Sequence, residues 1–280
     1  MQSNNYAYVN GRFLPEEQAT VSIFDRGFLY GYGVFETMRV YDGKVFRIVE
    51  HMQRLFEGLG FLGVESPLST EEIKAACSVL IERNFVRDGV ARVYMTSGIG
   101  DLVPASLAGR GATAVIVVQE RKFDVRGLHV IVSSRRLDKG LSRFKTANRL
   151  PYLLAAHEAE QARANEAILL NTENRVLEFF SSNLFVVKNA EVFTPPLEDG
   201  PLPGITRGAT LLLSSELRIA AHEVSFGLDF LEGADEIFAT SSLMEIVPVL
   251  RVGAQKFYAG MITQLLQRAY RALVRDELGL

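Results

Sequence analysis

Two tight-turn dipeptides near the start of the chain limit its N-terminal part to a fold that contains antiparallel strands. Asn10-Gly11 and Asp42-Gly43 each separate two short runs rich in alternating apolar residues. Both dipeptides favour the two-residue turn that joins neighbouring antiparallel strands. The predicted strands are residues 6–9 and 12–14 around the first turn, and 35–41 and 44–46 around the second.

Helix and strand patterns in the rest of the chain predict two α+β domains. Helical spacing of apolar residues predicts helices near 51–62 and 70–86, with a capping sequence at Ser69. The stretch 121–127 is charged and lacks periodicity, so we expect a linker there. Our predicted organisation is an N-terminal domain over 1–120, the linker 121–127 and a C-terminal domain over 128–280. Other predicted strands are 90–96, 112–119, 128–132, 166–170, 183–187 and 236–240; other helices are 151–164, one from about 206, and one over the last 20 residues.

Composition excludes several classes of protein. The net charge of −3 argues against a nucleic-acid-binding protein. The single cysteine, Cys77, leaves no internal disulfide, and the four histidines lack metal-ligand spacing, so we expect no metal and a reducing, cytoplasmic location. The first 20 residues are polar, unlike a signal or transit peptide, and no apolar run reaches the ~18 residues of a membrane span.

Lys145 and Glu178 are the first candidates for catalytic chemistry. Lys145 is one of only seven lysines among 30 basic residues, and it lies beside Phe144 at the mouth of a predicted helix. A neutral lysine amine attacks aldehydes, and a carboxylate buried in an apolar strand can keep a ring nitrogen protonated. The pair suggests a pyridoxal phosphate (PLP) site. An ordinary surface lysine and an outward-facing glutamate are the alternatives.

Three segments could hold a phosphate group. Residues 202–207 form a Pro/Gly turn that enters a helix at Thr206, and free amides at a helix N-terminus bind anions. Ser241 and Ser242 follow a short strand with their hydroxyls and amides, and Arg54 on a predicted helix offers a guanidinium. Each has an ordinary alternative: helix capping for the hydroxyl residues and solvent exposure for the arginine.

The combination and order of these motifs are specific, although each is weak alone. The set comprises 25–27, 31–36, 50–55, Lys145 with Asn148, Glu178 with 182–185, 202–207, 236–238 and Ser241-Ser242. Over nearly its whole length the chain resembles the class IV aminotransferase family. These fold-type IV PLP enzymes include branched-chain aminotransferases, D-amino acid transaminases and aminodeoxychorismate lyases.

The resemblance implies a fold, a cofactor and residue roles. It implies a two-domain α+β enzyme that uses PLP and forms a homodimer, with each site between the two domains and completed by the partner's N-terminal loop. Lys145 would form a Schiff base with the cofactor and shuttle the proton between Cα and C4′, and Glu178 would bond the pyridine nitrogen. The phosphate would be held by Arg54, Ile205, Thr206, Ser241 and Ser242.

The substrate-side residues match no subfamily completely. The resemblance makes Phe35, Arg92 and Arg149 candidates for substrate binding. Arg92 matches a basic position of the branched-chain enzymes, whereas Arg149 and the threonine after Glu36 are lyase-like. Ser97 stands where D-amino acid transaminases and lyases usually carry a carboxylate-binding arginine.

Three functions follow from these observations. The leading hypothesis is transfer of an amino group between an amino acid or amine and a 2-oxo acid, both small molecules, with no nucleic acid or membrane involved. The second is an aminodeoxychorismate lyase that releases pyruvate with the same lysine. The third is a PLP-binding protein without catalysis, which the retention of Lys145, Glu178 and Arg54 disfavours.

Overall fold

The computed structural model describes residues 5–102, 111–124 and 126–280, and the chain divides into two compact units. The first unit comprises Met1–Lys122, Phe144–Asn148 and Leu280, and the second comprises Phe123–Arg143 and Arg149–Gly279. Each unit combines helices with a sheet, which confirms the predicted α+β class. The predicted linker 121–127 includes residue 125, which lies outside the described residues.

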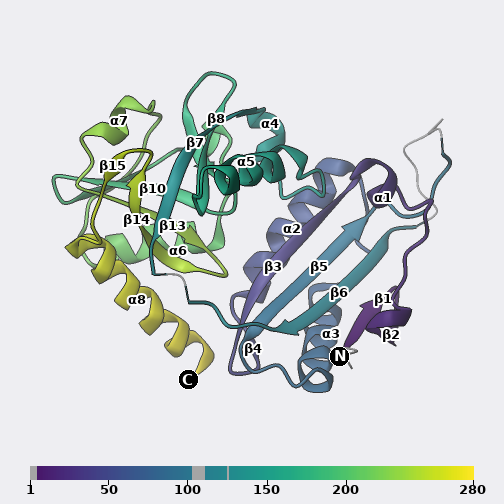
Figure 1. Cartoon of the computed structure of the whole chain (residues 1–280). Coiled ribbons are helices and arrows are strands. Elements are labelled where there is room, and N and C mark those ends of the chain that lie inside the picture. The colour runs from purple at the N-terminus through teal and green to yellow at the C-terminus, as the bar shows by residue number, and fades with distance from the viewer. Residues whose placement is uncertain (1–4, 103–110, 125) are drawn as a thin grey trace. The chain divides into compact units, whose positions relative to one another are not determined.

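The first unit contains an antiparallel six-stranded sheet in the order β2-β1-β6-β5-β3-β4. Helices α2 and α3 lie against one face of this sheet (Figure 1). The elements are β1 (Tyr6–Val9), β2 (Arg12–Pro15), η1 (Glu16–Gln18), α1 (Arg26–Tyr30), β3 (Gly33–Tyr41), β4 (Lys44–Val45), α2 (Ile48–Leu62), α3 (Thr70–Arg83), β5 (Gly89–Thr96) and β6 (Thr113–Glu120).

Local sequence signals predicted the strands and the two longer helices of this unit, although α3 ends at Arg83 and not near 86, and η1 and α1 were not predicted. Asn10 and Gly11 have φ of 46° and 86°, the positive values that the predicted tight turn between β1 and β2 requires. Asp42-Gly43 makes the same kind of turn between β3 and β4. At Ser69, the side chain accepts from the Glu72 amide and the Glu72 side chain bonds back, so α3 begins with a capping box.

The two faces of β3 have different roles. Val34, Met38 and Val40 are buried in the core that the sheet shares with α2 and α3. Side chains alternate along a strand, so Phe35 and Thr37 point to the opposite face. There they lie opposite Tyr94 and Arg92 of β5 in the antiparallel register.

The second unit contains a nine-stranded mixed sheet ordered β12-β11-β10-β13-β14-β7-β8-β9, with β15 paired to β14. Strand β7 runs parallel to both β8 and β14. Its first elements are β7 (Leu128–Leu137), α4 (Lys139–Ser142), α5 (Leu150–Gln161), β8 (Glu166–Asn171), β9 (Val176–Phe179), β10 (Asn183–Lys188), β11 (Glu191–Thr194) and η2 (Leu197–Asp199). They are followed by α6 (Ile205–Glu216), β12 (Ala221–Glu223), α7 (Asp229–Glu232), β13 (Glu236–Ser241), β14 (Glu245–Val252), β15 (Gln255–Lys256) and α8 (Met261–Leu278).

The predicted strands and helices of this half are present, with differences in length. Strand β7 continues to Leu137, beyond the predicted end near 132, because its C-terminal part still pairs with β8. Strands β11, β12, β14 and β15 and the short helices α4, η2 and α7 were not predicted from the sequence. In the part of the chain that the structure describes, no helix is long and apolar enough to cross a membrane.

Candidate active site

Lys145 lies in an extended segment paired with the start of β3, whereas the sequence had placed it at the mouth of a helix. The Phe35 amide donates to the Lys145 carbonyl at 3.0 Å, and the Ala147 amide donates to the Gly33 carbonyl at 2.7 Å. Helix α5 begins only at Leu150. Because backbone bonds on both sides fix this segment, the lysine is held against the sheet of the first unit.

The sheet face next to Lys145 carries two of the predicted substrate-side residues, Phe35 on β3 and Arg92 on β5. The Lys145 Nζ atom lies 4.9 Å from the centre of the Phe35 ring, and that ring stacks on Tyr94 with centroids 5.1 Å apart. The Arg92 guanidinium lies 5.2 Å from the same ring, and its Nε atom donates to Thr37 Oγ1 at 3.1 Å. The first unit thus brings an amine, an apolar ring surface and an exposed cation together.

Arg54 belongs to a buried polar cluster on the other face of β3. It forms two hydrogen bonds with the Glu36 carboxylate, which also contacts His51. Burial lowers the pKa of His51, against the opposing effect of Glu36, and the charge of Lys145 lowers it further. Burial alone would raise the pKa of Glu36, but Arg54 and His51 outweigh it and hold that pKa below its usual range.

Glu178 lies in β9 of the second unit as a buried carboxylate, 4% exposed. The Leu202 amide and the Asn183 Nδ2 atom each donate to its Oε2 atom at 3.1 Å. The Tyr152 hydroxyl donates to Oε1 at a longer 3.4 Å. Glu178 is therefore no surface glutamate, because an ordered set of donors surrounds its charge.

Arg149 lies close to this carboxylate through Tyr152. Its guanidinium carbon is 3.2 Å from the centre of the Tyr152 ring, and its Nη2 atom donates to the Phe180 carbonyl at 3.3 Å. Burial, with the Glu178 charge as the next cause, raises the pKa of Tyr152 above its ordinary value. The phenol therefore stays protonated and remains a donor to Glu178.

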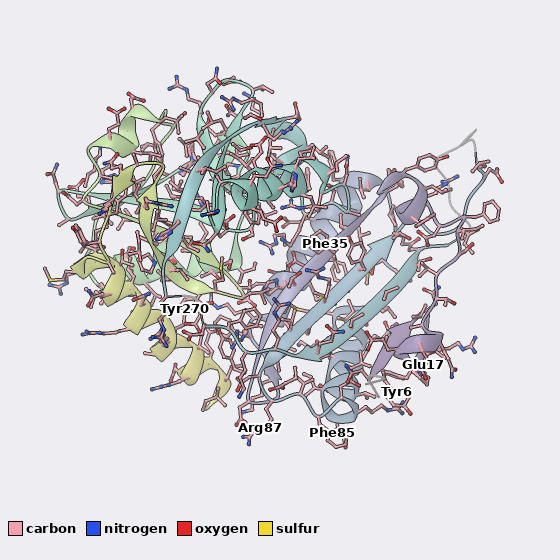
Figure 2. All side chains as sticks on the ribbon, in the orientation of Figure 1. Tyr6, Glu17, Phe35, Phe85, Arg87 and Tyr270 are labelled. Carbon is pink, nitrogen blue, oxygen red and sulfur yellow. The ribbon has the colours of Figure 1, made fainter. Side chains whose placement is uncertain are left out.

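The N-terminus of α6 has the features of an anion site. Gly204 is its N-cap, and no side chain caps the first turn. A Cβ atom on Gly204 would collide with Asn183 Oδ1, so glycine allows the helix end to approach the residue that bonds Glu178. The Thr206 hydroxyl lies 3.3 Å from the hydroxyl of Tyr270 on α8 (labelled in Figure 2). The neighbouring Ile205 is half-buried.

Ser241 and Ser242 lie at the end of β13, next to the strand β10 that carries Asn183. Thr240, the residue before them, pairs with Asn183 across β10 and β13. The Ser241 hydroxyl accepts a hydrogen bond from the Met244 amide at 3.2 Å, and both serines are half-buried. The Thr240 hydroxyl is buried and, within the described residues, has no hydrogen-bond partner.

Glu166 is a second buried carboxyl group in this unit, and no motif in the sequence singled it out. The hydroxyls of Ser181 and Ser182, in the loop between β9 and β10, donate to its Oε2 atom at 2.6 and 2.9 Å. Its Oε1 atom is buried with no partner among the described residues. Burial raises the pKa of Glu166 from 4.5 to about 7, although both hydroxyls act to lower it.

This burial predicts a dependence of stability on pH. A carboxyl group whose pKa is higher in the folded state stabilises the fold fully below its unfolded pKa of 4.5, and this contribution is lost as pH rises through about 7. The Glu166→Gln side chain does not titrate. Between pH 4.5 and pH 8, E166Q should therefore gain on the order of 3 kcal/mol of unfolding free energy relative to the wild type. Urea unfolding at both pH values measures this, and an equal change in the two proteins would contradict it.

Comparison with known proteins defines the class of enzyme that carries these residues. Residues 33–252 match the amino-transferase class IV family, and the chain belongs to this family. It is 35% identical over 272 residues to the putative branched-chain-amino-acid aminotransferase of Methanocaldococcus jannaschii, with 94% of each chain covered. Identity is 31% to an aminodeoxychorismate lyase of Bacillus subtilis (96% of this chain, 94% of that protein) and 29% to a D-alanine aminotransferase of Staphylococcus aureus (96% and 98%).

Solved structures agree in fold over nearly the whole chain. The branched-chain aminotransferase of Thermoproteus uzoniensis with norvaline matches with a TM-score of 0.90 at 31% identity, covering 98% of this chain and 95% of that one. A second branched-chain amino acid aminotransferase, solved with pyridoxamine 5′-phosphate, matches with a TM-score of 0.92 at 28% identity, covering 99% and 96%. The protein is a fold-type IV, PLP-dependent aminotransferase, and the predicted family, cofactor and reaction class are confirmed.

The residues of the chain fit this cofactor. Glu178 is a buried acceptor of the kind that a protonated ring nitrogen requires, and α6 begins with amides that no side chain caps. In the described ranges, no group of three or more histidines, cysteines, aspartates or glutamates could hold a metal ion. Sequence reasoning gave no role to Asn183, Tyr152, Glu36 or His51, which contact the predicted residues directly.

Proposed function

We propose that this aminotransferase takes its amino group from an aliphatic L-amino acid and delivers it to a 2-oxo acid. The position of the Lys145 Nζ atom, against Phe35 on the face that carries Arg92, is the observation behind the proposal. The stacked Phe35 and Tyr94 rings offer an apolar surface to an aliphatic side chain, and Arg92 offers a cation to a carboxylate. The branched-chain enzymes among the relatives support this substrate class.

Ser97 supports the same choice. D-amino acid transaminases and the lyases usually carry an arginine at this position, where it binds a carboxylate. Here the position is a serine that is 5% exposed, and its hydroxyl is buried without a partner among the described residues. A long cation would not fit a site of this burial without rearrangement. Arg149, fixed over Tyr152, remains the second substrate-side cation in the proposal.

Lys145 has two proposed tasks in the reaction, and Glu178 has one. When bound, PLP supplies an aldehyde that accepts the amino group and a ring that withdraws electrons from the reacting carbon. The Lys145 amine attacks as a nucleophile, and once released it carries a proton on Nζ between the two carbons of the transfer. Glu178, held by Asn183 and the Leu202 amide, accepts the hydrogen bond of the ring nitrogen.

The phosphate has its own set of proposed contacts. Arg54 supplies a guanidinium, Ile205 and Thr206 supply amides at the start of α6, and Ser241 and Ser242 supply hydroxyls or amides. Most of these residues lie in 128–280, which we therefore propose as the cofactor-binding domain, with 1–120 as the N-terminal domain. The buried free thiol of Cys77 supports a reducing, cytoplasmic location.

A donor screen on the holoenzyme tests the function. L-leucine, L-valine, their D-enantiomers, D-alanine and an (R)-amine are each added without a 2-oxo acid, and the cofactor absorbance is followed. We expect rapid conversion to the amino form with the aliphatic L-amino acids. Conversion by the D-amino acids or the (R)-amine, and not by the L-amino acids, would overturn the proposed stereochemistry. Release of pyruvate from aminodeoxychorismate without an acceptor would identify a lyase instead.

An exposed apolar patch supports the proposed homodimer. We define it by the large apolar side chains of 21–30 and 99–102, two segments that lie side by side because the Gly100 amide donates to the Phe24 carbonyl at 3.2 Å. Ile23 and Phe28 are 68% and 70% exposed. Contiguous exposed apolar surface of this kind marks an interaction site. The patch comprises Val21, Ile23, Phe24, Phe28, Tyr30, Ile99 and Leu102.

Replacing Phe28 with aspartate should therefore separate the subunits. In a two-fold dimer each substitution acts twice, and two phenylalanine burials of about 1.5–3 kcal/mol each predict a dissociation constant raised by roughly 10²–10⁴-fold. Phe85→Asp is the matched control, since Phe85 projects from the first unit after α3 with 89% exposure (Figure 2). Sedimentation velocity over a concentration series measures both variants. A dimer as tight as the wild type in F28D would place the interface elsewhere.

A further inference from the structure

Glu36 is a charged residue at a position where the strand pattern calls for an apolar one. It lies on β3 between Val34 and Met38, on the face packed against α2, and its side chain is fully buried. A buried carboxylate is costly unless cations or donors surround it. Apolar side chains fill the neighbouring positions of the same core, so Glu36 is a charged exception there.

Its partners form a fork that fixes one guanidinium. Arg54 Nε donates to Glu36 Oε1 at 2.6 Å, and Arg54 Nη2 donates to Oε2 at 2.7 Å. His51 Nδ1 lies 2.7 Å from Oε2 and, facing an ionised carboxylate, must carry the proton on that nitrogen. His51 and Arg54 are three residues apart on α2, so both side chains leave the helix on the same face. Their side chains are 1% and 9% exposed.

A two-bond fork determines the plane of a guanidinium as well as its position. With Nε and Nη2 both engaged by one carboxylate, rotation of the Arg54 head about its own axis is blocked. The His51 hydrogen bond fixes the carboxylate in turn, so the orientation of Arg54 depends on both partners. An arginine without these partners would lose side-chain rotamer entropy when it bound an anion. A pre-oriented arginine has lost that entropy already, so it binds the anion more tightly.

We propose that Glu36 is the positioning residue that orients Arg54 toward the cofactor phosphate, with His51 as its support. This inference rests on the proposed role of Arg54 as a phosphate ligand. Glu36 itself touches neither substrate nor cofactor in this scheme and acts through the arginine. The alternative is an ion pair that only stabilises the first unit and affects all cofactor forms alike.

Paired titrations with PLP and pyridoxal separate the two roles, because pyridoxal has the same ring and aldehyde without the phosphate. Glu36→Gln keeps the size of the side chain but turns an amide NH₂ group toward the donors of Arg54 or His51. We expect E36Q to weaken PLP binding by about 10- to 150-fold and pyridoxal binding by less than about threefold. Glu57 is an exposed carboxylate on α2, the helix that carries Arg54. Glu57→Gln is therefore the control and should change neither PLP nor pyridoxal binding.

Arg54→Ala and the double variant complete the experiment. R54A should weaken PLP selectively, and adding E36Q to it should change PLP binding by less than about threefold, because the two act through one contact. Equal loss of PLP and pyridoxal in R54A would refute the phosphate role of Arg54. If R54A loses PLP affinity selectively, but E36Q loses PLP and pyridoxal affinity equally or loses neither, the positioning role of Glu36 is refuted and the phosphate role of Arg54 stands.

Glu36→Asp covers the case in which E36Q does not fold, as judged by circular dichroism. Aspartate keeps the charge but is one methylene shorter, so it cannot reach both nitrogens of Arg54 at the present backbone position. We expect an intermediate loss of PLP affinity with pyridoxal affinity retained. Wild-type PLP affinity in E36D would overturn the proposal, because the fork would then be dispensable.

Discussion

Replacing Lys145 with alanine should reduce turnover by at least about 10³-fold while the cofactor still binds. The Nζ atom is the proposed nucleophile and also the proposed proton carrier, and general acid–base catalysis alone contributes about 10²–10⁴-fold. Cofactor binding should persist because the phosphate and ring contacts come from other residues. Stopped-flow absorbance of the half-reaction with L-leucine measures the rate, and borohydride reduction followed by peptide mass spectrometry locates the modified lysine.

Lys139→Ala provides the matched control for this prediction. Lys139 is exposed and forms an ion pair with Glu173, an interaction that contributes about 0–1 kcal/mol at a protein surface. Its removal should leave turnover within about twofold of the wild type. Turnover in K145A within about tenfold of the wild type, or borohydride labelling at another lysine, would remove Lys145 from its assigned role.

Local sequence signals predicted most of the elements of the fold but not the pairings between distant segments. The turns at Asn10-Gly11 and Asp42-Gly43 and the capping box at Ser69 depend on neighbouring residues, and all three are present. The segment around Lys145 differs because its partner, the start of β3, lies more than a hundred residues earlier. No periodicity within residues 143–151 records that pairing, so the propensities there suggested only the nearby helix.

The predicted site residues divide in the same way. Lys145 and Glu178 stand out by residue type in an apolar context. Glu36 carried a usable signal, because a glutamate between the core positions Val34 and Met38 on one strand must be buried with a partner. Asn183 carried none, since its role depends on the close approach of Gly204, which follows from the path of the chain between β10 and α6.

Glu178 is the residue whose replacement tests the electronic half of the proposed mechanism. Its Oε2 atom already accepts from Asn183 and from the Leu202 amide, so two donors hold the carboxylate in place for the hydrogen bond of a protonated ring nitrogen. Glutamine keeps the shape of the side chain but cannot offer a charge. Losing a charge-assisted hydrogen bond of about 1.5–3 kcal/mol in the transition state corresponds to about a 10- to 150-fold lower kcat.

We therefore expect E178Q to lower kcat by that factor with little change in KM, because the ring nitrogen lies on the cofactor and not on the amino acid. E178A should be worse, since it also leaves the Asn183 amide and the Leu202 N–H without their acceptor. Glu173→Gln, at an exposed carboxylate of the same unit, should match the wild type. Steady-state kinetics with L-leucine and 2-oxoglutarate, together with the absorbance of the bound cofactor across pH, distinguish these cases. A kcat for E178Q within about twofold of the wild type would show that ring protonation does not depend on this carboxylate.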